Sequence, residues 1–369
     1  MKIVIAMGGT GGHIYPGMVL ADQLIEKGNE VIIISRQGGI GQNILKEKKY
    51  NVINITGQGL KRKLSFALIV FLLKLKIGFL QSIALMIKLK PDVVIGMGGY
   101  LTPPVVLAAK VCGIPCIVHE QNVLPGLSVR LLSGIADKVA VSFEETKAYL
   151  KTKNVVVTGN FVRQSIYECS REEGMKQLEL SGSLITVLVF GGSQGASTIN
   201  YSMVEALKYL IPVRGGLQII HITGLGQFSK IQEEYRKYDY NYKIFPYLHT
   251  MEYAYACADL VISRSGATTV SEIIARKLPS ILIPYPHATA NHQLLNAKVI
   301  SDKGGGEILK DEELNGEILA DKIIKILKDK KELQTMKTNM EKIFPSQDIS
   351  LFTSIVYNLV KPAKNLNTC

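Results

Sequence analysis

The sequence predicts an α/β protein with two Rossmann-like, doubly wound domains, each a parallel sheet covered by helices. Short runs of β-branched residues alternate with helical stretches along the whole chain, which is typical of parallel sheets. A strand, a glycine loop and a helix follow one another twice, and the second copy begins 183 residues after the first. A chain of 369 residues also suits two domains of ordinary size.

Five strands are expected in each half. In the first half they are Ile3–Met7, Val31–Ile34, Val93–Gly96, Cys116–His119 and Val139–Val141. In the second half they are Thr186–Phe190, Gln218–Ile222, Lys243–Phe245, Leu260–Ile262 and Ser280–Ile283. The expected domains are residues 1–160 and 161–345. Residues 346–369 are expected to carry a helix that packs back across the join.

Two such domains that face each other would form a cleft lined by the carboxyl ends of both sheets, where open α/β sheets bind ligands. Glycine loops at these ends let backbone N–H groups approach a phosphate. A dinucleotide dehydrogenase fits poorly, because the first loop lacks the G-x-G-x-x-G spacing. The second strand ends at Ser35-Arg36 without an acid for a ribose, although Arg36 would suit a 2′-phosphate.

The net charge of +12 is concentrated in one region. The segment from Lys46 to Lys90 contains ten Lys and Arg residues and one acidic residue, Glu47, so its 45 residues carry a net charge of +9. An apolar helix with a basic cluster beside it is attracted to anionic lipid headgroups. We therefore expect a membrane-facing surface, made by the residues Lys61, Arg62, Lys63 and Phe66. The alternative is a core helix with solvated lysines.

Other classes of function are disfavoured by the same sequence. The apolar stretch of residues 64–87 is interrupted by Lys74 and Lys76, so it is not expected to span a membrane. No aromatic stacking platform accompanies the basic region, so nucleic acid is not an expected partner. The five cysteines lack metal-ligand spacing, and the first residues form an expected core strand rather than a leader. A reducing cytoplasm is the expected compartment.

Polar residues that suit a nucleotide gather in the second half. Thr268 and Thr269 open a helix after an expected strand, where hydroxyls and free amides can bind diphosphate oxygens. Glu272, about one turn further, can accept hydrogen bonds from both hydroxyls of a ribose. Ser193 lies on the second glycine loop, and Gln293 carries an amide that suits sugar hydroxyls. An ordinary helix cap with an acid in the first turn would by itself explain Thr268, Thr269 and Glu272.

Five motifs carry a resemblance to a known family. They are Gly8-Gly9-Thr10-Gly11-Gly12-His13-Ile14-Tyr15-Pro16-Gly17, His119-Glu120-Gln121-Asn122, Gly191-Gly192-Ser193-Gln194-Gly195-Ala196, Arg264-Ser265-Gly266-Ala267 and Gln293-Leu294-Leu295-Asn296-Ala297. In this order they resemble the MurG family, within glycosyltransferase family 28. Its members transfer N-acetylglucosamine from UDP-GlcNAc to the MurNAc 4-hydroxyl of lipid I, which gives lipid II for peptidoglycan.

The resemblance implies a GT-B fold, an inverting reaction, and no required metal or other cofactor. It implies a peripheral enzyme on the cytoplasmic face of the membrane, with UDP-GlcNAc and lipid I as substrates and other cell-wall synthesis proteins as candidate partners. The implied substrate-binding residues are Thr10, Gly11, Gly12, Tyr100, Asn122, Arg163, Ser193, Leu248, Arg264, Ala267, Thr268, Thr269, Glu272 and Gln293.

Individual roles also follow from the resemblance. Glu272 would hold the ribose, Ser193 a phosphate and Gln293 the hexose hydroxyls. Arg163 and the backbone of Leu248 would lie at the uracil. Tyr100 would line the acceptor side, while Thr10, Gly11, Gly12 and Asn122 would close over both substrates. Phe161 and His292 depart from the family's usual Pro and Gln, which puts the hinge and one sugar contact in doubt.

The reaction needs a base for the acceptor hydroxyl and a site for the charge of the leaving UDP. His13, whose ordinary pKa is near 6.5, is the first candidate base and Glu120 the second; each has a structural alternative. Arg264 either meets the UDP charge or pairs with an acid. Two other functions remain open: a glycolipid synthase that acts on diacylglycerol, and a catalytically silent sugar-nucleotide sensor.

Overall fold

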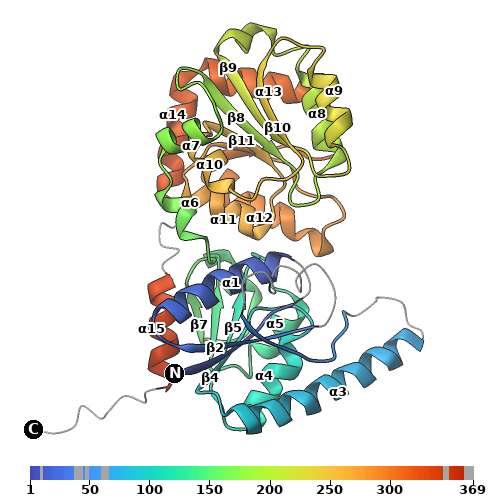
Figure 1. Ribbon diagram of the computed structural model, residues 1–369, viewed down its shortest axis with the longest axis vertical. Coiled ribbons are helices and arrows are strands. Elements are labelled where there is room, and N and C mark those ends of the chain that lie inside the picture. Colours follow the sequence, from blue (N-terminus) through green and yellow to red (C-terminus); the bar gives the residue numbers. More distant parts are fainter. Residues whose placement is uncertain (9–10, 37–44, 46–49, 60–65, 344–348, 361–369) are drawn as a thin grey trace, which may run out of the picture. The chain divides into compact units, whose positions relative to one another are not determined.

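The computed structural model describes residues 1–8, 11–36, 45, 50–59, 66–343 and 349–360, with backbone alone for 66–68. These residues form two compact units (Figure 1). The first is Met1–Phe161 together with Ser346–Cys369, and the second is Val162–Pro345. Thr10, Lys61, Arg62 and Lys63, all named above as site or membrane residues, lie outside the described residues, as does the side chain of Phe66.

The first unit is built on a parallel sheet with the strand order β3-β2-β1-β4-β5-β6-β7. Its strands are β1 (Lys2–Ala6), β2 (Glu30–Ser35), β3 (Asn51–Asn54), β4 (Val93–Gly96), β5 (Cys116–Glu120), β6 (Lys138–Val141) and β7 (Val155–Val157). Its helices are α1 (Gly11–Glu26), α3 (Phe66–Leu89), α4 (Thr102–Val111), α5 (Leu127–Leu132), the 3₁₀ helix η1 (Glu144–Tyr149) and α15 (Ile349–Val360).

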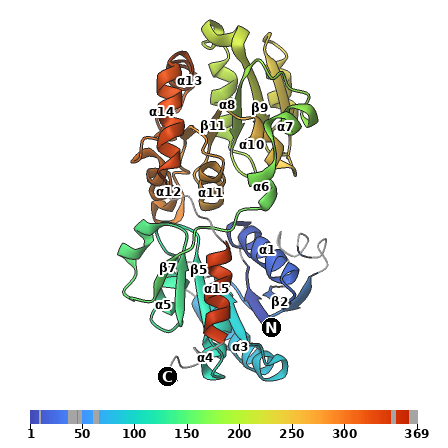
Figure 2. The ribbon, with the colours of Figure 1, turned by 90° about the vertical axis from the view of Figure 1, so that its left-hand side faces the viewer.

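Both faces of this sheet are buried, as expected for parallel strands. In β1, Ile3 and Ile5 face a core shared with α1 and α15, while Val4 faces a second core shared with α3, α4 and α5. Helix α15 follows the second unit in the chain yet packs on the first, beside α1 (Figure 2). Lys27 Nζ donates to Thr353 Oγ1 over 3.0 Å, which joins α1 to α15.

The second unit repeats the design with a sheet of order β10-β9-β8-β11-β12-β13, again parallel. Its strands are β8 (Ile185–Phe190), β9 (Leu217–Ile222), β10 (Asn241–Phe245), β11 (Leu260–Ser263), β12 (Ser280–Leu282) and β13 (Gly306–Ile308). Its helices are α6 (Gln164–Glu168), α7 (Arg171–Gln177), α8 (Ser197–Ala206), η2 (Ile211–Gly216), α9 (Phe228–Tyr235), α10 (Met251–Cys257), α11 (Ala267–Ala275), η3 (Thr289–Asn291), α12 (His292–Ser301), α13 (Gly316–Lys328) and α14 (Lys330–Glu341).

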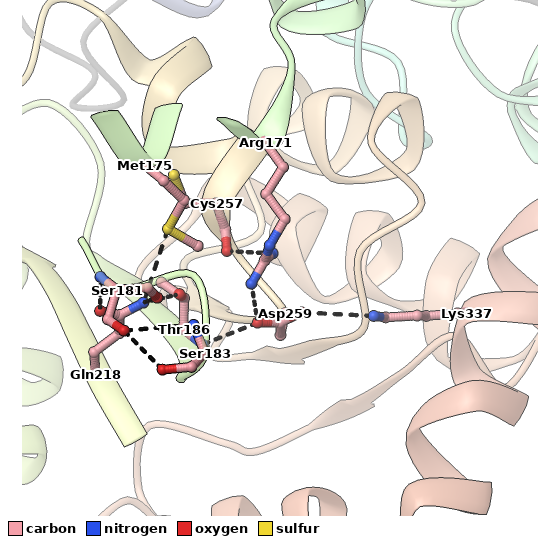
Figure 3. Close-up of polar contacts among 9 residues, drawn as sticks. All are labelled: Arg171, Met175, Ser181, Ser183, Thr186, Gln218, Cys257, Asp259 and Lys337. Carbon is pink, nitrogen blue, oxygen red and sulfur yellow. Dashed lines mark hydrogen bonds and ion pairs between the residues drawn. The ribbon is translucent and has the colours of Figure 1, made fainter. Parts of the chain in front are cut away.

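Polar contacts tie the amino ends of the strands in this unit to the surrounding helices (Figure 3). Asp259 Oδ2 accepts from the backbone N–H of Thr186 over 2.9 Å and from Arg171 Nη2 over 2.8 Å. The buried Gln218 donates to Thr186 Oγ1 and to the carbonyl of Ser181, each over 2.8 Å. These contacts anchor the edge of the sheet opposite to the carboxyl ends of its strands.

The expectation of two doubly wound domains is confirmed, and all ten expected strands are present within two residues of their predicted bounds. The prediction did not include β3, β7 and β13, which lie at sheet edges. Each is three or four residues long, too short for a hydrophobic period to be recognised.

Helix α3 runs without interruption through Lys74 and Lys76, the two charges that divide its apolar stretch. Within the described part of the chain, Ile69–Leu89 is the one helix long and apolar enough to cross a membrane by length and composition, with a mean hydropathy of 1.9. One side of α3 belongs to the core of the first unit, through Ile83 and Met86. Its other side exposes large apolar residues, among them Leu72, Leu80 and Ile87.

Candidate active site

In each unit several of the predicted site residues follow the two neighbouring strands between which the strand order reverses. In the first unit β1 and β4 are neighbours, and the chain after β1 leads to His13 while the chain after β4 leads to Tyr100. In the second unit β8 and β11 are neighbours, and they lead to Ser193 and Thr268. Ligands of open α/β sheets bind at such switch points.

The loop after β8 carries Ser193 on a tight, exposed turn that ends at the start of α8. Gly192 and Gly195 adopt φ values of 94° and 79°, which glycine tolerates best. A Cβ at Gly195 would lie 2.1 Å from the carbonyl oxygen of Thr223, so no larger residue fits there without a shift. Helix α8 has no side-chain cap, which leaves its first N–H groups available to an anion.

Helix α11 presents a second uncapped N-terminus beside the first. Gly266 takes the N-cap position and offers no side chain, and Ala267 begins the helix. The Oγ1 of Thr268 is buried and has no hydrogen-bond partner among the described residues. A buried hydroxyl without a partner is costly unless a ligand supplies one. Thr268 and Thr269 in the first turn therefore form a suitable place for diphosphate oxygens.

Glu272 lies in the same helix and is held by an aromatic hydroxyl. Tyr255 Oη donates to Glu272 Oε2 over 2.9 Å. Burial raises the pKa of Glu272, while the nearby Arg163 and the bond from Tyr255 act to lower it. Arg163 itself is anchored by the carbonyl of His249 at 3.3 Å and by Glu252 at 3.5 Å. The structure thus brings Glu272, predicted to bind the ribose, close to Arg163, predicted to bind the uracil. Leu248, also predicted at the uracil, precedes His249 in the chain.

Gln293, in α12, has its amide orientation set by the backbone. Its Oε1 accepts from the N–H of Tyr285 over 2.9 Å, which turns the NH₂ group outward as a donor. Its carbonyl accepts from Ser265 Oγ over 2.8 Å, which ties α12 to the start of α11. His292, the departure from the family pattern, bonds through Nδ1 to the carbonyl of Thr289 over 2.9 Å.

Arg264 shows the second of the two roles considered for it. Its side chain is 10% exposed and forms an ion pair with Asp311. The guanidinium also donates to the carbonyls of Ile283 and Pro284 over 3.2 Å, and to Thr198 Oγ1 over 2.9 Å. Arg264 therefore joins the end of β11 to the start of α8 and supports the loops that follow β8 and β11.

In the first unit Glu120 is buried at 2% exposure, and both its carboxylate oxygens are occupied. Oε1 accepts from the backbone N–H and Nδ2 of Asn122 over 2.9 and 3.2 Å, and Oε2 accepts from the N–H of Gly126 over 2.8 Å. These contacts match the structural alternative for Glu120, because they shape the loop that presents Asn122. The ring of Tyr100 packs near Gly57 and Gly59.

His13 lies at the first turn of α1, two residues after Gly11 and directly after Gly12. Its Nδ1 is 2.8 Å from Gln121 Oε1, and its ring packs over Gly98 and Gly99. Its Nε2 has no hydrogen-bond partner within the described ranges. Of the two candidate bases, His13 is therefore the one with an unoccupied nitrogen.

Some residues of this site were not assigned a role from the sequence. Tyr255 and Asp311 lie outside the motifs, so only the fold reveals their contacts with Glu272 and Arg264. Gln121 was visible as part of the second motif, but its hydrogen bond to His13 spans 108 residues. Phe161, at the hinge position, stacks on His119 with ring centroids 4.5 Å apart and meets Phe352 edge-on, which accounts for an aromatic residue there.

Among the residues that the structure describes, no group of three or more His, Cys, Asp or Glu side chains is arranged to hold a metal ion. The cysteines Cys112, Cys116, Cys169 and Cys257 are unpaired thiols.

Two parallel-sheet units, with uncapped helices after neighbouring strands of the second unit, are the architecture of a glycosyltransferase of the GT-B fold. Comparison with known proteins agrees with this class of enzyme. Residues 3–141 match the glycosyltransferase family 28 N-terminal domain, and residues 186–350 match the family 28 C-terminal domain. The chain belongs to glycosyltransferase family 28.

Similar proteins cover nearly the whole chain. A Halothermothrix orenii protein is 42% identical over 93% of this chain and 95% of its own length. It is named UDP-N-acetylglucosamine–N-acetylmuramyl-(pentapeptide) pyrophosphoryl-undecaprenol N-acetylglucosamine transferase, as is a Thermodesulfovibrio yellowstonii protein with 41% identity over 89% and 90%. The crystal structure of Acinetobacter baumannii MurG matches with a TM-score of 0.78 and 27% identity, over 97% of this chain and 99% of that one.

The supporting role of Arg264 leads to a stability prediction. We expect Arg264→Met to lower the free energy of unfolding of the second unit by about 3–5 kcal/mol, because Asp311 remains buried without its partner. Because the chain has no tryptophan, chemical denaturation followed by far-UV circular dichroism measures this loss. The double variant Arg264→Met with Asp311→Leu should recover much of it. Unchanged stability in the single variant would contradict the supporting role.

Proposed function

We propose that this chain transfers N-acetylglucosamine from UDP-GlcNAc to the MurNAc 4-hydroxyl of lipid I and so forms lipid II. The observation that carries the proposal is identity of 42% with a transferase of that name across 93% of this chain. The arrangement of the described residues supports it, because each unit offers one part of the required chemistry. The second unit has the features of a sugar-nucleotide site, and the first unit offers a base.

The donor is proposed to bind along the loops after β8, β11 and β12. The diphosphate would accept hydrogen bonds from the N-termini of α8 and α11, near Ser193, Thr268 and Thr269. The dipoles of the two helices favour negative charge at these ends. Glu272 would bind the ribose hydroxyls and Gln293 would donate to the hexose. Anchoring of the phosphates by amides supports a reaction that requires no metal, since these groups stabilise the charge of the departing UDP.

The proposed chemical step is a single displacement with inversion. His13 Nε2 takes the proton of the acceptor hydroxyl as its oxygen attacks the anomeric carbon of the donor. The bond between that carbon and the phosphate oxygen breaks, and its electron pair leaves with UDP. One proton moves to His13 and one negative charge moves to the leaving group.

A direct assay tests the function. Purified protein with UDP-GlcNAc is offered lipid I and diacylglycerol side by side, and UDP release and the lipid product are measured, the latter by mass spectrometry. We expect lipid II from the first acceptor, no product from the second, and the same rate after treatment with EDTA. Turnover on diacylglycerol alone would establish the glycolipid synthase instead. Donor binding without turnover on either acceptor would establish the sensor.

The proposed ribose contact predicts the effect of removing one carboxylate. Glu272→Ala should weaken UDP-GlcNAc binding by about 1.5–3 kcal/mol, the usual worth of hydrogen bonds to a charged group. Isothermal titration calorimetry measures the change. The matched control is Tyr255→Phe, which removes the partner of Glu272 but keeps its carboxylate, and should cost less than about 1 kcal/mol. Equal affinity in wild type and Glu272→Ala would remove this residue from the donor site.

The acceptor is a lipid, and the first unit has a surface that would suit a membrane. Helices α3, α4 and α5 cover the same face of the sheet and expose large apolar residues. They are Ile69, Leu72, Leu73, Ile77, Leu80, Ile87, Leu107, Val111, Leu127 and Leu131. The exposed Lys76, Lys88 and Arg130 lie on the same helices. We propose that this surface, with Lys61, Arg62, Lys63 and Phe66, docks on the cytoplasmic face of the membrane without crossing it.

Charge removal tests the docking. Replacing Lys61, Arg62 and Lys63 by Ser should weaken co-sedimentation with anionic vesicles by about 1 kcal/mol per charge. The matched control replaces the exposed Lys328, Lys330 and Lys331 of the second unit, which changes the net charge equally and should leave vesicle binding unchanged. Equal loss in both variants would indicate a nonspecific charge effect, and no loss in the first would leave α3 as a core helix only.

A further inference from the structure

A continuous series of hydrogen bonds, buried except at His13, connects His13 to the backbone at the end of the first unit. His13 Nδ1 and Gln121 Oε1 are 2.8 Å apart. Gln121 Nε2 is 3.0 Å from the carbonyl of Met97 and 3.0 Å from His119 Nδ1. His119 Nε2 in turn is 3.0 Å from the carbonyl of Gly159. Every bond in the series joins residues of the first unit.

The two carbonyl groups determine the direction of every bond, since a carbonyl oxygen can only accept. His119 must therefore carry its hydrogen on Nε2, to donate to Gly159, and its Nδ1 must accept. Gln121 can meet both the carbonyl of Met97 and the Nδ1 of His119 only with its NH₂ group. The reversed amide would place Oε1 against the carbonyl of Met97. Oε1 of Gln121 therefore faces His13 and requires a donor there.

Burial supports this assignment. His119 is fully buried and Gln121 is 1% exposed, so the partners available to them are the ones named. Burial lowers the pKa of His119 to about 4, so its ring is neutral and carries a single N–H at neutral pH. A neutral His119 has one donor and one acceptor, which the bonds to Gly159 and Gln121 use.

We propose that Gln121, itself oriented by His119 and Met97, is a positioning residue that holds neutral His13 in the tautomer with hydrogen on Nδ1. This leaves the lone pair of Nε2 as the proton acceptor for the reaction. The inference rests on the proposed function, in which His13 is the base. The same Nδ1–H bond persists after His13 has accepted a proton, so no rearrangement accompanies the step.

The packing around His13 supports a fixed ring. Gly98 and Gly99 adopt φ values of 83° and 73° directly beneath it. A Cβ at Gly98 would lie 3.2 Å from both Nδ1 and Cε1 of His13, and one at Gly99 would lie 3.3 Å from Cδ2. The glycine pair therefore allows the ring to lie close to the backbone, where Nδ1 reaches Gln121.

The tautomer can be observed without any activity measurement. In protein labelled with ¹⁵N-histidine, long-range ¹H–¹⁵N correlations distinguish protonated from bare ring nitrogens, and a His13→Gln variant assigns the signals. At a pH where the free imidazole is neutral, we expect Nδ1 of His13 to be protonated and Nε2 bare. The opposite pattern in wild type would overturn the inference while leaving the lipid II assay unaffected.

Two substitutions at Gln121 separate tautomer control from a merely structural role. Gln121→Met and Gln121→Glu both remove the amide that donates to Met97 and His119. Glu keeps an oxygen that accepts from His13, and in this buried position its other oxygen carries a proton that replaces one of the two donated bonds. We expect Gln121→Met to shift His13 toward the Nε2–H tautomer and to lower kcat about 100-fold, a usual worth of general-base catalysis. The KM for UDP-GlcNAc should change less than about twofold, as for an interaction used in the chemical step.

Gln121→Glu should retain the Nδ1–H signal and restore most of kcat relative to Gln121→Met. Equal kcat in the two variants would overturn the positioning role. If Gln121→Met changes the tautomer yet keeps full kcat, tautomer control stands and His13 is not the base, so the proposed mechanism fails instead. The matched control is Gln218→Met, which removes an equally buried glutamine at the amino edge of the second sheet (Figure 3) and should leave kcat and the His13 signals unchanged.

Discussion

Parallel strands place every loop that follows a strand at one edge of the sheet, and this constraint organises both units. The sheets reverse their strand order between β1 and β4 and between β8 and β11, so two loops diverge at each of these points. In the second unit the diverging loops lead into two uncapped helices, α8 and α11. Their free N–H groups and the buried hydroxyl of Thr268 are the groups that we propose bind the diphosphate of the donor.

Buried polar contacts hold these loops in place, and they differ in purpose between the units. In the second unit Arg264 pairs with Asp311 and donates to Thr198, so a buried cation joins the end of β11 to the segment after β13 and to the start of α8. In the first unit Glu120 shapes the loop of Asn122, while Gln121 bonds to His13. Neighbouring residues of one motif thus shape a loop and bond to His13, the proposed base.

Much of this was predictable from the sequence, because hydrophobic runs and glycine loops are local signals. They gave the central strands, the doubly wound class and the positions of Ser193, Thr268, Glu272 and His13 at strand ends. The short edge strands carried too little pattern to be recognised. The partners Tyr255 and Asp311 are brought in by tertiary packing, and the choice between two roles for Arg264 depended on an acid 47 residues away in the chain.

Donor binding as proposed requires the second unit to hold the diphosphate by its backbone amides. A crystal structure of the protein soaked with UDP-GlcNAc tests this directly. We expect phosphate oxygens within hydrogen-bonding distance of the amides at Ser193 and at Thr268 and Thr269, with the ribose on Glu272. Electron density for the donor at any other place, or phosphates without contacts to α8 and α11, would contradict it.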